Sequence, residues 1–422
     1  MGHSSALKRT RLSVTAVFFA NGIALGAWGT CIPGVAKSLN LDPGSYGEVV
    51  APYAIGAILS MLLTGWLTTR IGTKWTILLG SLLVAGTLPI PARSSSIPLL
   101  ALSIFFLGAA NSVMDVSMNA HAALIERDWE SEIMSTFHSL ASFGALAGAA
   151  LSGLLFARGY DAKIIMVAAT AFIGVIVFAV YPRITDLRPD PPEKSVKVRV
   201  WTNRTLLVIS GLTFLALFAE FGMFEWSYKY VRDVAGASPA LATFGYGGYV
   251  LGAALSRLFG DAVKLRIGTR AMVLGGGLLA CGGLLIAIML PTAVPAVIGF
   301  ICAGLGLANM VPMLYTRAAA AVDGAPGVGV GVCGVISYAG PVAEPLMIGY
   351  VALHHGQRVG LGLPMAAILA IVVCAPIISR MRTLQHHPSA ADLIIAEPTD
   401  SVVLAPASHE VLRWWSTWDS DR

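Results

Sequence analysis

Charged residues are scarce in this chain: only 12% of its 422 residues are Asp, Glu, Lys or Arg, while 56% are hydrophobic. Soluble globular domains usually contain about 25% charged residues, so this composition excludes an ordinary soluble protein. At roughly 20 residues per span plus short loops, the chain has room for about a dozen membrane-spanning helices. Little length is left for a separate catalytic domain.

Cysteine is also sparse, and its five residues stand singly inside apolar segments, without a CxxC pair or other metal-ligand spacing. We therefore expect packing cysteines and no metal site. The sequence lacks a nucleotide-binding P-loop and a cluster of nucleophile and base, so we expect no enzyme activity. The net charge of +5 falls in short loops and not on one stripe, which argues against a nucleic-acid partner.

The chain repeats itself with a shift of 196 residues. Residues 70–74, RIGTK, return as RIGTR at 266–270, and upstream Tyr53, Gly56 and Ser60 return as Tyr249, Gly252 and Ser256. Doubling of an apolar chain is typical of secondary transporters, in which two repeats enclose a site near the middle of the membrane. The repeat therefore predicts two pseudo-symmetric bundles.

Apolar runs bounded by glycine, proline or charge predict twelve transmembrane helices, six in each bundle of an all-α membrane protein. The runs cover residues 12–36, 46–69, 75–92, 97–121, 134–157, 162–181, 205–230, 240–260, 271–290, 294–318, 328–353 and 358–381. The first run is too long for a signal peptide and lacks a cleavage site, so we expect it to be a retained span.

Lys and Arg concentrate in alternate loops on the side of the N-terminus, which predicts that both termini are cytoplasmic. We expect an N-terminal bundle over 1–181, a solvated linker rich in proline and basic residues over 182–204, a C-terminal bundle over 205–382 and a tail over 383–422. Near the end of the tail, residues 411–418 form either a short interfacial helix or a frayed end with incidental tryptophans.

Residues 65–74, GWLTTRIGTK, resemble the signature between the second and third helices of the major facilitator superfamily, with Thr69 where an acid is common. Further stretches at 111–121, 137–139 and 219–233 look like the MosC/YbjJ-type bacterial branch, which is distantly related to fucose-permease-like symporters. The resemblance spans roughly residues 12–382. It implies the major facilitator fold, transport, and a place in the bacterial cytoplasmic (inner) membrane, and it names no cargo.

The signature loop supplies candidate gating residues. Gly72 permits a tight turn, while Arg70 and Lys74 can pair with acids or helix ends of the other half. A purely topogenic role for these bases is the alternative. The further gating candidates are Arg266 and Arg270 in the second repeat and His138 at the start of the fifth helix.

Polar residues that break the repeat are the better site candidates, because both halves need the same scaffold whatever is carried. Asn111, Asp115 and Asn119 are spaced by four residues and so share one side of the fourth helix. They either face a cavity or are satisfied against the fifth helix by His138 and Ser142. Asn21, Trp28 and Tyr338 are weaker candidates, and for Trp28 packing or a lipid-facing position is the alternative.

Three carboxyl groups in spans are hypotheses for the binding of protons or cargo, because burial of a carboxylate is costly unless it faces water, pairs or is protonated. Glu220 has no base within one helical turn and is the predicted proton site. Glu225 is predicted to pair with Lys229, one turn later. Glu344 lies between two prolines that predict a bend, as a cavity residue or a structural hydrogen bonder.

Arg257 interrupts the eighth helix near its cytoplasmic end. We expect it to extend its head group to the interface or to pair with Asp261. Direct binding of cargo is the less favoured alternative.

The sequence thus predicts a monomeric secondary active transporter of a small polar solute, such as a sugar or polyol. Its partners would be that solute and the lipid bilayer, and alternating access would be driven by a proton gradient without a cofactor. One alternative is a metabolite or drug efflux antiporter. An alternative of another class is a membrane sensor that does not transport.

Overall fold

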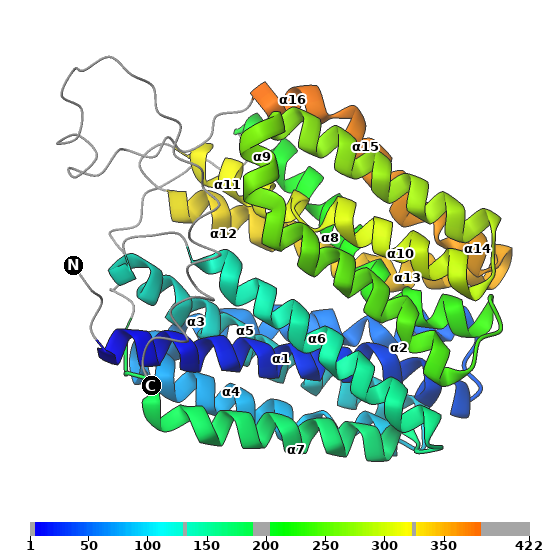
Figure 1. The fold of residues 1–422 in the computed structure, drawn as a ribbon, viewed down its shortest axis with the longest axis horizontal. Helices are drawn as coiled ribbons and strands as arrows, with labels where there is room; N and C mark the ends of the chain where they lie inside the picture. The colour runs from blue at the N-terminus through cyan, green and yellow to red at the C-terminus, as the bar shows by residue number, and fades with distance from the viewer. Residues whose placement is uncertain (1–4, 130–132, 189–202, 323–325, 381–422) are drawn as a thin grey trace, which may run out of the picture.

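In lipid, a chain can satisfy its backbone polar groups within one segment only as a helix. The computed structural model describes residues 5–129, 133–188, 203–322 and 326–380, and all regular structure in these ranges is helical (Figure 1). The N-terminal half holds α1 (Ser5–Ser38), α2 (Pro43–Val50), α3 (Pro52–Ile71), α4 (Thr73–Thr87), η1 (Pro91–Arg93), α5 (Ile97–Trp129), α6 (Met134–Ala157), α7 (Ala162–Val180) and η2 (Tyr181–Arg183).

The C-terminal half contains the longest helix, α9, which runs through two predicted spans with a break in helical geometry at Gly268. Its elements are α8 (Arg204–Asp233), α9 (Pro239–Met289), α10 (Ala293–Leu307), α11 (Met310–Ala320), α12 (Pro326–Ser337), α13 (Ala339–His355), α14 (Gln357–Gly360), α15 (Gly362–Val373) and α16 (Ala375–Arg380). Each of the twelve predicted segments overlaps described helices. Of the linker predicted over 182–204, residues 189–202 lie outside the described residues, and so does the tail with its predicted interfacial helix.

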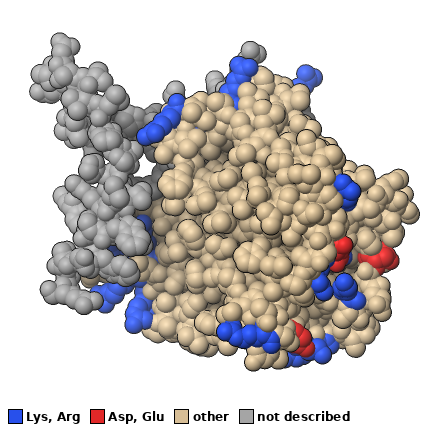
Figure 2. Space-filling view, turned by 45° about the vertical axis from the view of Figure 1, so that its right-hand side comes forward, with Lys and Arg blue, Asp and Glu red and all other residues tan. Residues whose placement is uncertain are grey.

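The outer surface of the described part suits a bilayer. Nine helices there are long and apolar enough to cross a membrane, and the count is ten if the bent pair within 43–71 is one span. Figure 2 shows a face almost free of charge, with Lys and Arg toward its edges. The protein is therefore a multi-pass integral membrane protein.

The sequence repeat reappears contact for contact. A Cβ on Gly56 would collide with the carbonyl oxygen of Phe105, and a Cβ on Gly252 would collide with that of Ile301. The hydroxyl of Ser60 donates to the carbonyl oxygen of Ala109 at 3.0 Å, and the hydroxyl of Ser256 donates to that of Leu305 at 2.7 Å. The two halves therefore use the same helix contacts, as the sequence predicts.

The signature loop also repeats its backbone geometry. Gly72 has φ 89° and Gly268 has φ 76°, in the region that residues with a Cβ rarely adopt. The predicted tight turn at Gly72 is confirmed, and its counterpart explains the break inside α9.

The helix bundles have two ends, which we call the proximal face and the distal face. The proximal face carries the start of α1, the turn at Gly72 and the start of α8, while the distal face carries the loops 39–42, 158–161 and 234–238 (Figure 1). Four helices begin at side-chain caps: Asp42, Asp161, Asn203 and Ser238 each accept a hydrogen bond from the backbone N–H three residues later. Such caps satisfy N–H groups that the first turn leaves free.

The cap at Asp42 gives a first prediction. Its carboxylate accepts bonds from the backbone N–H and the hydroxyl of Ser45, both at 2.9 Å, and these bonds lower the pKa of Asp42. Asp42→Ala should reduce the free energy of unfolding by about 1 kcal/mol at neutral pH. Because the pKa is lowered on folding, this contribution is complete above the unfolded-state value and is lost as pH falls through the folded-state value.

Thermal unfolding of purified protein at neutral and acid pH measures this effect. Glu48→Ala is the control, because Glu48 lies exposed on the same short helix. An equal loss of stability in both variants at neutral pH would contradict the capping role.

Glycines set the closest helix contacts within each half. A Cβ on Gly144 of α6 would collide with the carbonyl oxygen of Phe19 on α1. In the other half, a Cβ on Gly340 of α13 would lie 2.6 Å from the carbonyl oxygen of Phe214 on α8. Glycine at these two positions therefore lets the helix backbones approach closely.

Contacts between the halves are tightest toward the distal face. A Cβ on Gly47 of α2 would collide with the carbonyl oxygen of Pro345 on α13, and one on Gly349 would lie 2.8 Å from the carbonyl oxygen of Pro43. A Cβ on Gly153 of α6 would likewise lie 2.6 Å from the hydroxyl of Thr243 on α9. We call the contact of α2 with α13 the distal gate.

Candidate functional site: a cavity between the halves

A cavity lies between the two halves, below the distal gate. It encloses about 860 Å³ including its open mouth, within the roughly 300–1,000 Å³ usual for small-molecule sites. Helices of both halves line it, and its polar groups include Asn111, Ser112, Asp115 and Glu225. The repeat thus encloses a cavity between its copies.

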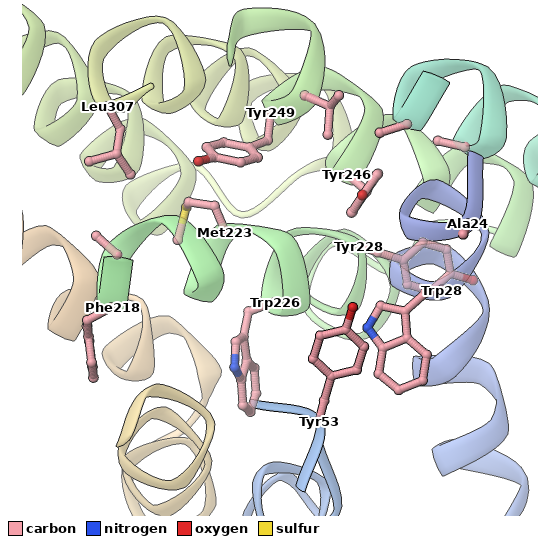
Figure 3. Close-up of a cluster of buried hydrophobic side chains, with 14 of the residues drawn as sticks. Ala24, Trp28, Tyr53, Phe218, Met223, Trp226, Tyr228, Tyr246, Tyr249 and Leu307 are labelled. Atoms are coloured by element: carbon pink, nitrogen blue, oxygen red, sulfur yellow. The ribbon is translucent and has the colours of Figure 1, made fainter. Parts of the chain in front are cut away.

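Aromatic rings form much of the cavity wall. Trp28 stacks on Tyr53 with ring centres 5.3 Å apart, and Figure 3 shows the two rings side by side. Phe224 packs edge-on against Tyr249 at 5.2 Å, and Phe224, Tyr246 and Trp28 line the cavity. The alternative of a lipid-facing Trp28 is wrong, because this side chain is only 7% exposed and faces inward.

The polar stripe on α5 has two kinds of contact. Asn111 and Asp115 line the cavity, and the amide of Asn21 on α1 donates to Asn111 Oδ1 at 2.9 Å. Asn119 donates to the carbonyl oxygen and to Oδ1 of Asp115, at 2.8 and 3.1 Å. Asn21 is buried and ties α1 to α5, whereas Asp115 presents its carboxyl group to the cavity with one described partner.

The alternative in which side chains of the fifth predicted helix, α6, form hydrogen bonds with Asp115 is wrong. The hydroxyl of Ser142 on α6 donates to the carbonyl oxygen of His138 at 3.1 Å and accepts from Arg257 at 3.1 Å. These contacts direct Ser142 toward the C-terminal half and away from α5.

A buried ion pair joins α8 to α9. Arg257 Nη2 donates to Glu220 Oε1 at 2.6 Å, and the exposed fractions of the two side chains are 21% and 7%. The expectation that Arg257 extends to the interface is therefore wrong. Glu220 has no base within one turn of its own helix, but it pairs with a base of the neighbouring helix, and its role as a proton site stays a prediction. The side chain of Asp261 lies outside the described ones.

His138 lies next to this ion pair. Arg257 is close enough for its charge to act on the imidazole, and the ring of Phe18 packs edge-on against it at 5.5 Å. His138 and Arg257 keep part of their surface exposed, which indicates that the space between the halves opens toward the proximal face. A gating role for His138 stays a prediction.

Glu225 does not pair with Lys229, so that prediction is wrong. Lys229 Nζ donates to Asp233 Oδ2 at 2.7 Å and lies 5.0 Å from the ring centre of Tyr46 on α2. Both acids stand one turn from the lysine, and the later one lies nearer the distal face, where water can solvate the pair. Glu225 points inward and is 8% exposed.

Glu344 is completely buried, and neither of its oxygens has a hydrogen-bond partner among the described residues. The expected structural hydrogen bond is thus not formed with any of them. The bend predicted between Pro341 and Pro345 stays a prediction: the helix is interrupted earlier, between the end of α12 at Ser337 and the start of α13 at Ala339, and Pro345 lies inside α13. Tyr338, at this break, and Pro341 line the cavity.

The bases of the signature loop contact their own half. Arg70 lies over the ring of Trp66 at 5.5 Å, and Lys74 lies over that of Tyr181 at 4.9 Å. Gly72 packs against the Asp186 carboxylate. The expected pairing of these bases with acids of the other half is not formed within the described part of the chain. Arg266 and Arg270 are exposed, and gating roles for all four stay predictions.

Sequence reasoning missed two features of this site. It did not predict the ion pair of Glu220 with Arg257. Both residues differ from their counterparts in the other half, and this shared difference could have indicated the pair. It also treated repeated residues as scaffold, yet Tyr53, which returns as Tyr249, lines the cavity.

Comparison with known proteins gives consistent matches over most of the chain. Residues 14–345 match the Major Facilitator Superfamily. The chain is 31% identical to membrane protein MosC of Rhizobium meliloti, covering 90% of this chain and 93% of MosC. It is 29% identical to an uncharacterized MFS-type transporter of Yersinia pestis, covering 88% and 96% of the two chains.

Solved structures share the fold. The nucleoside transporter NupG superposes with a TM-score of 0.67 at 14% identity, covering 88% of this chain and all of that chain. A bacterial homolog of the human lysosomal transporter Spinster, in an inward-facing and unoccupied conformation, superposes with a TM-score of 0.69 at 16% identity. That match covers 90% of this chain and 97% of the other.

Proposed function

Because the chain belongs to the major facilitator superfamily, as a transporter of its MosC-like bacterial branch and not an enzyme, we propose that it carries a small polar solute of the sugar or polyol type. Transport would be secondary active, by alternating access and coupled to protons. The observation that carries this proposal is the cavity between the halves, in which aromatic rings surround a few polar groups.

The lining supports a polyhydroxylated solute. The rings of Trp28, Tyr53 and Phe224 offer flat apolar surfaces for the C–H faces of a sugar ring, as small-molecule sites commonly do. Asp115 accepts hydrogen bonds from hydroxyl groups, and Asn111 can donate and accept. In this proposal Asp115 fixes the orientation of the solute.

The described conformation corresponds to one state of the cycle. The distal gate is closed by backbone contacts that leave no space for a Cβ, while His138 and Arg257 keep exposed surface toward the proximal face. With both termini in the cytoplasm of a bacterial inner membrane, as the Lys and Arg distribution favours, this state is inward-facing. Rocking of the halves would close the proximal side and open the distal gate.

Proton coupling is favoured by the carboxyl groups of Asp115 and Glu225 in the cavity wall, since such groups can take up a proton where water reaches them only in part of the cycle. No cofactor enters this proposal: the proton gradient supplies the energy. The functional unit would be the monomer in the bilayer, because the cavity lies within one chain.

Counterflow in proteoliposomes tests the proposed function. A thermal-shift screen with monosaccharides, cyclitols and linear polyols selects solutes, and uptake is then measured with and without an inward proton gradient. Asp115→Asn should reduce uptake by about tenfold or more, since one hydrogen bond to a charged group contributes roughly 1.5–3 kcal/mol. Asp161→Asn is the control, because it changes a carboxylate at a distal helix start and keeps a good cap.

The same assay separates the alternatives. Hits confined to lipophilic cations, with proton-driven export, would replace the polyol proposal by an efflux antiporter. Solute binding without counterflow would favour a sensor. Equal uptake by wild type and Asp115→Asn would remove Asp115 from the binding site.

A further inference from the structure

Two buried carboxyl groups, Glu225 on α8 and Glu344 on α13, lie just beneath the distal gate. Glu344 packs on Gly222: its Cγ and Oε1 lie 3.4 Å from the place where a Cβ of Gly222 would stand. Gly222 precedes Glu225 by three residues, and residues three apart are neighbours on a helix surface. The missing side chain of Gly222 thus leaves room for the carboxyl group of Glu344 on the surface of α8, one turn from Glu225.

The structure provides little to neutralise two charges there. Oε2 of Glu225 and both oxygens of Glu344 have no hydrogen-bond partner among the described residues. Lys229 is one turn from Glu225, but it is bonded to Asp233. Two ionised carboxylates so close together and so buried would repel each other without compensating bonds. One proton shared by the two groups removes this repulsion.

Other titratable groups face this pair from each neighbouring element. They are Tyr46 on α2, Tyr53 on α3, Asp115 on α5, Lys229 and Asp233 on α8, and Tyr246 on α9. The hydroxyl of Tyr246 is buried without a described partner, in the wall of the cavity that Glu225 also lines. Lys229 is the only basic residue in this set, and it is bonded to Asp233. No free positive charge of the set therefore neutralises the two carboxyl groups, and this favours the binding of a proton between them.

The pair is placed to respond to the gate. Pro345, whose carbonyl oxygen meets Gly47, directly follows Glu344. The hydroxyl of Tyr46, from the other half, donates to the carbonyl oxygen of Glu225 at 3.4 Å, and its ring packs edge-on against Trp226 at 5.3 Å. Separation of α2 from α8 and α13 would therefore bring water from the distal side to both carboxyl groups.

We propose that Glu225 and Glu344 together bind one proton, and that this proton stabilises the closed distal gate. With the gate open, a proton from the distal solution adds to one of two hydrated carboxylates and leaves a carboxylic acid beside a carboxylate. Closure then covers the pair. Release proceeds through Glu225, which lines the cavity, to water from the proximal side; use of this proton to drive uptake rests on the proposed function.

Infrared difference spectroscopy tests the binding of the proton. The full-length protein is placed in nanodiscs of phosphatidylethanolamine and phosphatidylglycerol, and spectra are compared across a pH series. The carbonyl stretch of a protonated carboxyl group should grow as pH falls, and Glu225→Gln and Glu344→Gln should each remove that component. Glu48→Gln, which removes an exposed carboxyl group of α2, is the control and should keep it.

Distances between spin labels test the link to the gate. Labels at Ser95→Cys and Thr292→Cys, in exposed distal loops of the two halves, are introduced after replacement of the five native cysteines by alanine. In the otherwise unchanged protein the distance should lengthen as pH rises. Each glutamine variant, which mimics the protonated group, should keep the short distance at every pH.

Retention of the infrared component in both glutamine variants would overturn the proposal. So would a distance that responds to NaCl and not to pH, because the pair would then be a metal-cation site. If one variant does not fold, the other decides. Loss of the infrared component in the glutamine variants, together with a short label distance at every pH, supports the proposal. Uptake of the panel solutes that does not respond to a proton gradient would contradict only the proposed transport coupling.

Discussion

Gly47→Ala is expected to hold the distal gate partly open and to lower counterflow by about tenfold or more. The added methyl group would collide with the carbonyl oxygen of Pro345, and backbone on both sides leaves no flexible side chain to yield. Forcing one methyl group into a packed contact costs about 1–3 kcal/mol. Since only the closed state carries this penalty, the equilibrium between states shifts by about 5- to 150-fold.

Gly34→Ala is the matched control, because no atom lies within 4 Å of a Cβ at that position near the distal end of α1. Counterflow and the distance between labels at Ser95 and Thr292 are measured for both variants. Equal rates and equal distances in the two would mean that the gate does not need a glycine at position 47.

Arg257→Gln is expected to destabilise the protein by about 3–5 kcal/mol, because it leaves the buried carboxylate of Glu220 without its cation. The double variant Glu220→Gln, Arg257→Gln should recover most of this loss, since two neutral side chains can still bond to each other. Unfolding of purified protein in a fixed detergent micelle gives the four free energies of the cycle.

An exposed ion pair after α7 is the control. Arg188 and Asp186 lie 4.0 Å apart, and their side chains are 62% and 37% exposed, so water solvates both charges. Removal of the Arg188 charge there should cost about 1 kcal/mol or less. A similar loss at both pairs, or no recovery in the double variant of Glu220 and Arg257, would show that charge compensation is not what Arg257 provides.

The helices of this protein follow from its sequence because the bilayer dictates their length and their apolar character. The sequence repeat further predicted that the two halves share their helix contacts and turns, and Gly72 and Gly268 indeed both have positive φ. The extents of the helices were less predictable: α1 includes residues 5–11 and α5 includes residues 122–129, which lie outside the predicted runs 12–36 and 97–121. These additional turns lie beyond the apolar runs, and there Arg11 lies over the ring of Trp129, 4.4 Å from its centre.

Partners across helices could not be predicted in the same way. Glu225 and Asp233 are each four residues from Lys229, so spacing alone could not identify its partner. In the structure Lys229 bonds to Asp233, the acid nearer the distal end. Glu220 meets Arg257 only because α8 and α9 approach each other, which no spacing within one helix can indicate.

The residues of the cavity wall could not be fully predicted for a second reason. Repeated residues can face the cavity, because two pseudo-symmetric halves meet there, so the repeat alone does not separate scaffold from site. Tyr53 illustrates this: its repeat partner Tyr249 is fully buried, while Tyr53 itself lines the cavity.

The paired serine bonds bear on how the chain assembles during synthesis. The bonds from Ser60 to Ala109 and from Ser256 to Leu305 each close a loop of 49 residues. Because the entropy lost on loop closure depends on loop length, both halves meet the same entropic cost at the same stage of their emergence. The first half can therefore complete this core before the second half is made, and the second then follows the same route beside a finished neighbour.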